Sequence, residues 1–217
     1  MGLDFTVVWE GLPYLLLGAL VTIEVTVIAL VLGSIIGLMA GLARLSKNRY
    51  LAGLAAVYVA FIRGTPLLVQ LFILYFGLPQ MGVKLPAFLC GVIGLSIYSG
   101  SYISEIVRGA IQSIDRGQTE AARSLGFSPA QTMRLVVLPQ AFLRMLPPLG
   151  NEFIALIKNS SLVSLLTIQD LMRAGQRIIS ITFRSFEVYI AVAVLYFLLT
   201  YTMSVITRRM EQALRIQ

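Results

Sequence analysis

The chain has 217 residues, of which 58% are hydrophobic and 12% are charged, and its net charge is +7. Soluble domains carry about 25% charged residues, so a soluble fold of this composition could not cover its apolar surface. With no histidine and one cysteine, Cys90, the composition argues against zinc or haem binding, His-based catalysis and disulfide bonding. It predicts an integral membrane protein with no metal or cofactor of its own. The basic residues are expected to anchor loops at the lipid surface rather than to bind nucleic acid.

Five apolar segments are predicted to cross the membrane as helices, since a hydrocarbon core of about 30 Å needs about 20 helical residues. They are residues 12–42, 50–78, 87–107, 135–157 and 186–206. The second is interrupted by Arg-Gly-Thr-Pro at 63–66, and the fourth is bent by Pro139, Pro147 and Pro148. The apolar segment 162–171 is too short to cross, so it is expected to be re-entrant or packed against the bundle.

The basic residues predict the orientation of these spans. Ten of the 17 lie in the loop 43–49, the loop 108–134 and the tail after residue 206, whereas the loop 79–86 holds only Lys84. The positive-inside rule then places the N-terminus outside and the C-terminus inside. The segment 158–184 is the exception, because its basic residues lie on the outer side: Lys158, Arg173, Arg177 and Arg184.

The first span carries Gly33, Gly37 and Gly41 at four-residue spacing, which leaves one helix face without side chains. Such a face lets two helix backbones approach closely in lipid. The spacing alone leaves open whether the partner is a helix of this chain or another subunit.

A short helix is predicted at about residues 117–126, in the polar stretch between the third and fourth spans. Asp115 is a candidate N-cap and Gly126 a candidate stop, and a second helix would begin at Ser128 with Gln131 completing a capping box. Its small surface could dock in a groove of a partner, but an amphipathic helix on the lipid surface has the same pattern, and the pattern alone does not favour docking. That surface is formed by Ala121, Ala122 and Leu125.

This stretch resembles the EAA motif in the permease subunits of bacterial ABC importers. The matching residues are Glu120, Ala121, Ala122, Gly126, Leu138 and Pro139, and the departure is Val136, where isoleucine is usual. Residues 61–79, 105–111 and 158–164 are similar to further stretches of the polar amino-acid permeases, of histidine, glutamine and arginine type.

The resemblance implies a type I ABC importer permease, all-α with five spans and one transmembrane domain over residues 1–217. The helix at 117–126 would be the coupling helix, which contacts an ATPase through Glu120, Ala121, Ala122, Leu125 and Gly126. Two ATPase subunits that bind ATP-Mg, a second permease subunit (a copy or a sister chain) and an extracytoplasmic amino-acid-binding protein would complete the assembly in the bacterial inner membrane. This chain has no G-x-x-x-x-G-K-[ST] loop for ATP phosphates, so it is expected to be a transport subunit rather than an enzyme.

Ionisable groups within a span are costly and mark candidate sites. Glu24 and Glu152 are such groups, and Asn159 lies on the face of Glu152, two turns on, where Ser160 and Ser161 predict a helix break. The predicted substrate-binding residues are Glu24, Glu152, Asn159, Ser160 and Ser161, in a shared cavity for a polar amino acid, and its acidic residues would suit a cationic one.

Three alternatives remain open for the charged residues of the spans. Glu152 could instead form a structural ion pair with Lys158. Glu105 is more simply explained by an i,i+3 ion pair with Arg108. Arg63 could reach an interface if residues 51–62 lie along the membrane surface.

Two other functions are weighed against the importer. An ion-coupled secondary transporter or channel would also use buried acids and broken helices. It would not explain the helix at 117–126, and five spans are few for a self-contained carrier. A membrane-embedded enzyme is disfavoured, because no defensible catalytic pair of residues occurs.

Overall fold

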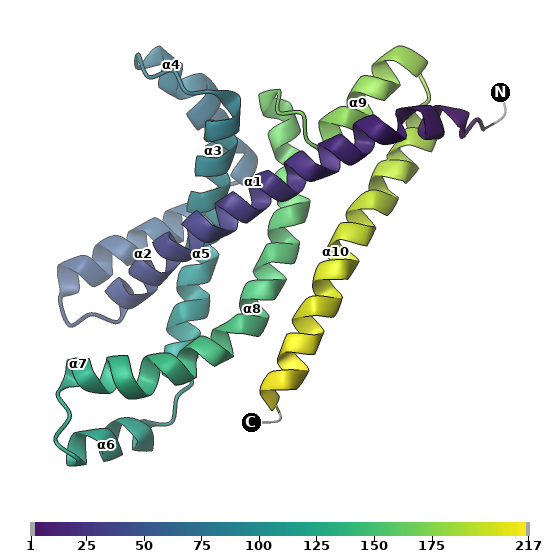
Figure 1. Ribbon diagram of the computed structural model, residues 1–217. Helices are drawn as coiled ribbons and strands as arrows, with labels where there is room; N and C mark the ends of the chain where they lie inside the picture. Colours follow the sequence, from purple (N-terminus) through teal and green to yellow (C-terminus); the bar gives the residue numbers. More distant parts are fainter. Residues whose placement is uncertain (1–2, 216–217) are drawn as a thin grey trace.

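The computed structural model describes residues 3–215, and nearly all of them are helical (Figure 1). The elements are α1 (Thr6–Arg44), α2 (Arg49–Gly64), α3 (Leu67–Phe72), η1 (Ile73–Gly77), α4 (Leu78–Gln80), α5 (Ala87–Gln112), α6 (Arg116–Ser124), α7 (Pro129–Thr132), η2 (Met133–Val137), α8 (Leu138–Asn159), η3 (Ser160–Leu166), α9 (Leu171–Thr182) and α10 (Ser185–Arg215). No strand is present within residues 3–215.

Three helices, α1, α5 and α10, are long and apolar enough to cross a membrane. They confirm the predicted spans at 12–42, 87–107 and 186–206. The predicted span 50–78 is not one helix. The helix α2 and the segment from α3 to α4 meet at an angle of 104°, so they form one crossing only if the bent pair spans the membrane together. The cause is the Thr65–Pro66 step, whose extended backbone ends α2 as expected for a residue before proline. The fourth span, on α8, remains a prediction.

The contact between α1 and α5 is the most extensive helix pairing in the described chain. It is made at the glycine face of α1. A Cβ atom added to Gly37 would lie 2.6 Å from Ile103 Cβ and 2.9 Å from the Gly100 carbonyl oxygen, and one added to Gly41 would lie 2.8 Å from Val107 Cβ. The glycine ladder is therefore occupied by a helix of the same chain.

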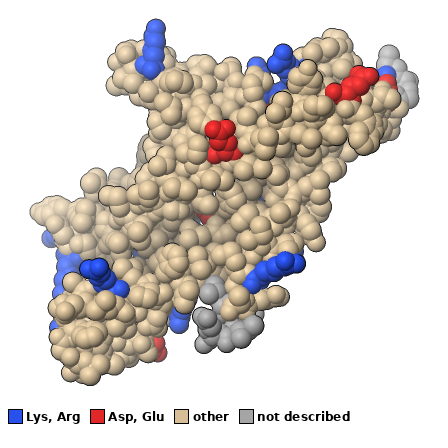
Figure 2. Space-filling model, in the orientation of Figure 1, with Lys and Arg blue, Asp and Glu red and all other residues tan. Residues whose placement is uncertain are grey.

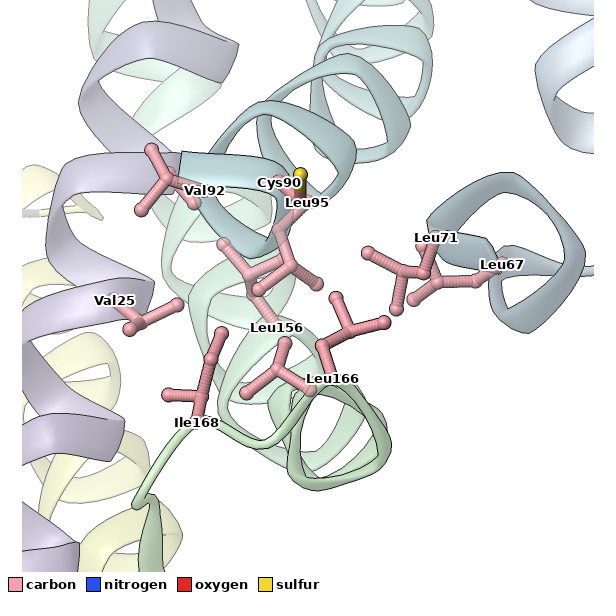
Figure 3. Packing of buried hydrophobic residues seen from close by; sticks show 11 residues of the cluster. Val25, Leu67, Leu71, Cys90, Val92, Leu95, Leu156, Leu166 and Ile168 are labelled. Atoms are coloured by element: carbon pink, nitrogen blue, oxygen red, sulfur yellow. The ribbon is translucent and has the colours of Figure 1, made fainter. Parts of the chain in front are cut away.

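A hydrophobic cluster joins four helices around this pair (Figure 3). The side chains come from α1, α3, α5, α8 and the η3 segment that follows it. They include Val25, Leu67, Leu71, Cys90, Leu95, Leu156 and Leu166. Leu166 is completely buried, so the predicted short apolar segment at 162–171 does pack against the bundle.

Two π-helical segments, η1 and η2, each end two residues before a proline, Pro79 and Pro139. Proline has no N–H to donate to the preceding turn, and a wider turn is one way for a helix to accommodate it. Figure 1 shows the chain changing direction between α7 and the upper part of α8.

Different helices lie at the two ends of the molecule (Figure 1). The start of α1, the start of α10 and α9 lie at one end, where the Asp4 amide donates to Glu187 Oε1 at 3.0 Å. The helix α6 and the last turns of α10 lie at the opposite end. On the face shown in Figure 2, most charged side chains lie toward these ends, and uncharged residues cover most of the surface between them.

Replacing Gly37 by alanine should destabilise the protein by about 1–3 kcal/mol, because a methyl group there overlaps Ile103. Gly53, on α2, is the matched control: no atom lies within 4 Å of its added Cβ, so Gly53→Ala should be neutral or slightly stabilising. Thermal unfolding of the purified variants measures both. An equal effect of the two substitutions would contradict the α1–α5 contact.

Candidate functional site

The helix α6 has the termini that the sequence predicts. The Asp115 carboxylate accepts from the Gly117 amide at 2.6 Å, and the chain leaves the helix through Gly126, whose φ of +87° favours glycine. The Phe127 amide donates to the Ala122 carbonyl at 3.1 Å, as in a Schellman cap. Ser128 and Gln131 form the predicted capping box at the start of α7.

The surface of α6 is almost entirely exposed, and it lies at one end of the molecule (Figure 1). Glu120, Ala121 and Gly126 are exposed, and Leu125 is 78% exposed. Ala122 is the one buried residue of α6, at 4% exposure. Four of the five predicted coupling residues are thus available to a partner, whereas Ala122 is buried against the rest of the chain.

Glu105, on α5, lies within ion-pair distance of three arginines. It forms ion pairs with Arg44 at 2.5 Å, with Arg108 at 2.8 Å and with Arg63 at 3.4 Å. The predicted pair of Glu105 with Arg108 is confirmed, and the other two partners come from the ends of α1 and α2. Because one carboxylate faces three guanidinium groups, this cluster keeps a local excess of positive charge.

Glu152, on α8, is buried, with 9% of its surface exposed, and its Oε1 atom has no hydrogen-bond partner in the described chain. No ion pair joins it to Lys158 within residues 3–215, so the structural alternative for Glu152 is not supported. The Ser99 hydroxyl of α5 lies beside this carboxyl but outside hydrogen-bonding geometry, and it is itself buried without a partner in the described chain. A buried, unpaired carboxyl is costly and suits a ligand that completes its hydrogen bonds.

A line of polar groups runs from Glu152 toward the arginine cluster. Tyr98 lies within electrostatic range of both Glu152 and Arg63. Its hydroxyl is 3.2 Å from that of Tyr102, and the Arg63 guanidinium lies 5.0 Å from the centroid of the Tyr102 ring. An anionic group and a cationic group therefore flank two tyrosines.

The other predicted site residues lie elsewhere. Glu24 is exposed and lines a hollow of about 500 Å³ with Phe88 and Thr167, which contains neither Glu152 nor Asn159. Ser161 lines another hollow, of about 310 Å³, with Lys158.

The predicted helix break is present, because α8 ends at Asn159 and a 3₁₀ segment follows. The serine hydroxyls there are already used: Ser160 donates to the Ile157 carbonyl and Ser161 to the Lys158 carbonyl.

Ser99, Tyr98 and Tyr102 were not predicted from the sequence as site residues. The available signal was their position on α5, where Tyr98, Tyr102 and Glu105 recur at spacings of four and three and so share one helix face. No cluster of three metal-ligating side chains occurs in the part of the chain that the structure describes.

Comparison with known sequences identifies one family. The sequence model described as "Binding-protein-dependent transport system inner membrane component" matches residues 29–216. The glutamine transport system permease protein GlnP of Escherichia coli (strain K12) is 42% identical, and the alignment covers 100% of both chains. The arginine transport system permease protein ArtQ of Bacillus subtilis (strain 168) is 36% identical, with 99% of each chain covered.

Two solved structures share the fold. A chain in the "Crystal structure of an amino acid ABC transporter with histidines" superposes with a TM-score of 0.94 at 43% identity, covering 98% of this chain and 100% of that one. A chain of the MetNI methionine ABC transporter in an inward-facing conformation superposes with a TM-score of 0.80 at 22% identity, covering 93% and 96%. At that identity the second likeness concerns the fold alone.

The Glu105 cluster predicts unequal couplings in double-mutant cycles of unfolding free energy. The pair with Arg44 is short and largely shielded, so Glu105→Gln with Arg44→Gln should give a coupling of about 1.5–3 kcal/mol. The Arg63 side chain is 43% exposed and more distant, so its coupling should stay below about 1 kcal/mol.

Denaturant unfolding of the single and double variants measures both couplings. The control is Glu120→Gln, whose exposed carboxylate makes no ion pair in the described chain and whose effect should lie within about 0.5 kcal/mol of zero. Equal couplings for the two arginines would show that Glu105 does not prefer Arg44.

Proposed function

Because this chain belongs to the family of binding-protein-dependent transport system inner membrane components, it is a permease subunit of an amino-acid ABC transporter, and we propose that it forms the pathway for a polar amino acid. The relatives are named for glutamine and arginine, which are both polar. The single observation that carries the proposal is the buried carboxyl of Glu152 beside Ser99 and Tyr98, whose Oε1 atom has no hydrogen-bond partner in the described chain. The permease is the non-catalytic component of such systems, and ATP is hydrolysed on a separate subunit.

In this proposal the chain is one domain over residues 1–217 with five crossings. The fifth crossing, beyond α1, α5, α10 and the bent α2–α4 segment, is α8. It is less apolar than α1, α5 and α10, and it carries Arg144, Glu152 and Lys158, the kind of residues that line a pathway. The end with α6 faces the cytoplasm and the end with α9 faces outward, which gives an outer N-terminus and an inner C-terminus in the bacterial inner membrane.

Glu152 would hold the α-amino group, or a cationic side chain, of the substrate. A charge-assisted hydrogen bond in a dry site is worth roughly 1.5–3 kcal/mol, and Glu152 has a free acceptor for it. Asn159, Ser160 and Ser161 follow on the same chain segment and would contribute amide or backbone groups near the helix break. Glu24 would act at a separate point of the route, in its own hollow.

The helix α6 would be the element that couples this subunit to the ATPase. Its exposed residues Glu120, Ala121, Leu125 and Gly126 offer a small surface that a groove could enclose. Behind it, Gln140 of α8 donates to Gln118 at 3.3 Å, so α6 is tied to the helix that carries Glu152.

The proposed assembly contains two permease subunits, the second being a copy or a sister chain, and two ATPase subunits that hold ATP-Mg. An extracytoplasmic amino-acid-binding protein delivers the substrate, and membrane lipid surrounds the permeases. This chain itself binds no cofactor.

Leu125→Asp should lower uptake and ATPase stimulation at least tenfold without lowering the melting temperature, because this side chain is 78% exposed. The matched control is Ala130→Asp on α7, which is also exposed and adds the same charge. Ala122→Trp is not an equivalent test, since Ala122 is buried within the chain and its loss would disturb folding. Normal transport by Leu125→Asp would show that α6 does not couple the two subunits.

Glu152→Gln should weaken substrate affinity by about ten- to a hundredfold and abolish substrate-stimulated ATP hydrolysis, while basal hydrolysis and protein yield are retained. The control Glu10→Gln removes an exposed carboxylate near the start of α1 and should have no effect. Glu24→Gln tests the second point of the route separately. Unchanged uptake in Glu152→Gln would place the pathway elsewhere.

A further inference from the structure

The basic residues of α9 are among those that the orientation rule does not explain. Arg173 and Arg177 lie at the outer end of the molecule in the proposed orientation, where the positive-inside rule disfavours them. Neither makes an ion pair within residues 3–215. Basic side chains gather over α9 in Figure 2. Two guanidinium groups on one helix face, with no ion pair in the described chain, can together bind one anionic partner.

The acidic groups near α9 do not pair with these two arginines. The Asp170 carboxylate is completely buried, accepts from the amides of Met172 and Arg173, and is contacted by the Tyr196 hydroxyl. Glu187 pairs with Arg184. Glu24 lies in an adjoining hollow, but it forms an ion pair with neither arginine. The positive charge of Arg173 and Arg177 is therefore not neutralised by the acidic residues that the structure describes.

The two arginines border two hollows that meet. One hollow, of about 380 Å³, is polar and is lined by Gln169, Arg173, Gln176, Arg177 and Ser180. The other, of about 340 Å³, lies between α1 and α9, and its walls are mostly apolar: Tyr14, Leu17, Val21, Ile178 and Ile181. Arg177 and Gln169 line both, so a cationic, hydrogen-bonding site opens directly onto an apolar groove.

The floor of the groove is held by a close helix contact. A Cβ atom added to Gly18 of α1 would lie 2.9 Å from Ala174 Cβ and from the Asp170 carbonyl oxygen. This contact leaves the larger side chains of α1 and α9 as the walls of the groove. It also fixes the distance between the arginine face and α1.

The same level of the molecule has the features of a membrane interface. Trp9 is 75% exposed and Tyr14 62% exposed on α1, and such aromatic residues collect at the level of lipid headgroups. At the end of α9, Ile181 and Phe183 are also exposed beside the charged face. A short helix with a basic face and an exposed apolar edge is typical of the interface plane.

We propose that the groove between α1 and α9 binds an anionic phospholipid, with the phosphate on Arg173 and Arg177 and an acyl chain along Leu17 and Ile181. Paired guanidinium groups suit phosphate oxygens, and basic pockets beside spanning helices bind anionic headgroups. An acidic protein surface could use the arginines but would leave the apolar groove empty, which is why the lipid is favoured.

The test uses the full-length permease in neutral detergent and compares binding of phosphatidylglycerol and phosphatidylcholine by native mass spectrometry. The double variant Arg173→Gln with Arg177→Gln should weaken phosphatidylglycerol binding about tenfold to thirtyfold, since each charge contributes about fivefold. Lys84→Gln with Arg116→Gln removes the same charge from exposed sites elsewhere and should change binding less than twofold.

A second pair of variants tests the groove. Leu17→Trp fills it and should weaken phosphatidylglycerol binding, whereas Leu20→Trp, equally exposed on α1 but outside the groove, should not. These binding measurements do not involve transport, so their outcome is separate from that of the proposed function.

Equal retention of the two lipids by the unsubstituted protein, or equal effects of the two tryptophan variants, would overturn the proposal. So would a loss of binding-protein stimulation in the arginine variant with unchanged lipid binding, because the anionic partner would then be a protein.

Discussion

The close backbone contact between α1 and α5 is the constraint on which the rest of the structure depends. In lipid, apolar surface gives helices little reason to associate, so close packing and polar contacts must hold them together. The glycine face of α1 provides such packing along the length of α5, from Ser96 to Val107. It fixes the register of the two helices, and this register brings Arg44, at the end of α1, to Glu105.

With this register, two acidic residues have different surroundings. Glu105 lies where the ends of α1 and α2 converge, and it is neutralised by three arginines. Glu152, on α8, lies beside Ser99 of α5, and it forms no ion pair within the described residues. A buried carboxyl costs free energy unless a partner satisfies it, so Glu152 is the group with a free hydrogen-bonding capacity to offer. The difference follows from which helix ends lie near each residue, rather than from the residues themselves.

The sequence predicts what is local and misses what depends on packing between distant segments. The caps of α6 and α7 depend on neighbouring residues, so Asp115, Gly126 and Ser128 were found. The spans α1, α5 and α10 follow from composition. Thr65–Pro66 predicts a break but not its angle of 104°, and Glu152 predicts a site but not Ser99, which is more than fifty residues away.

Continuity of the chain connects the two ends of the molecule. The segment from Pro129 to Asn159 is helical without interruption, apart from its π-helical turn at η2, and it carries Glu152. At its lower end it is fastened to α6 by Gln140 and to the end of α5 by Arg144, which donates to the Ser113 carbonyl. A displacement of α6 would therefore reach α8 through direct contacts, while the glycine contact holds α5 against α1. Since Ser99 belongs to α5 and Glu152 to α8, relative movement of these two helices would change the surroundings of the buried Glu152 carboxyl, whose Oε1 atom has no partner in the described chain.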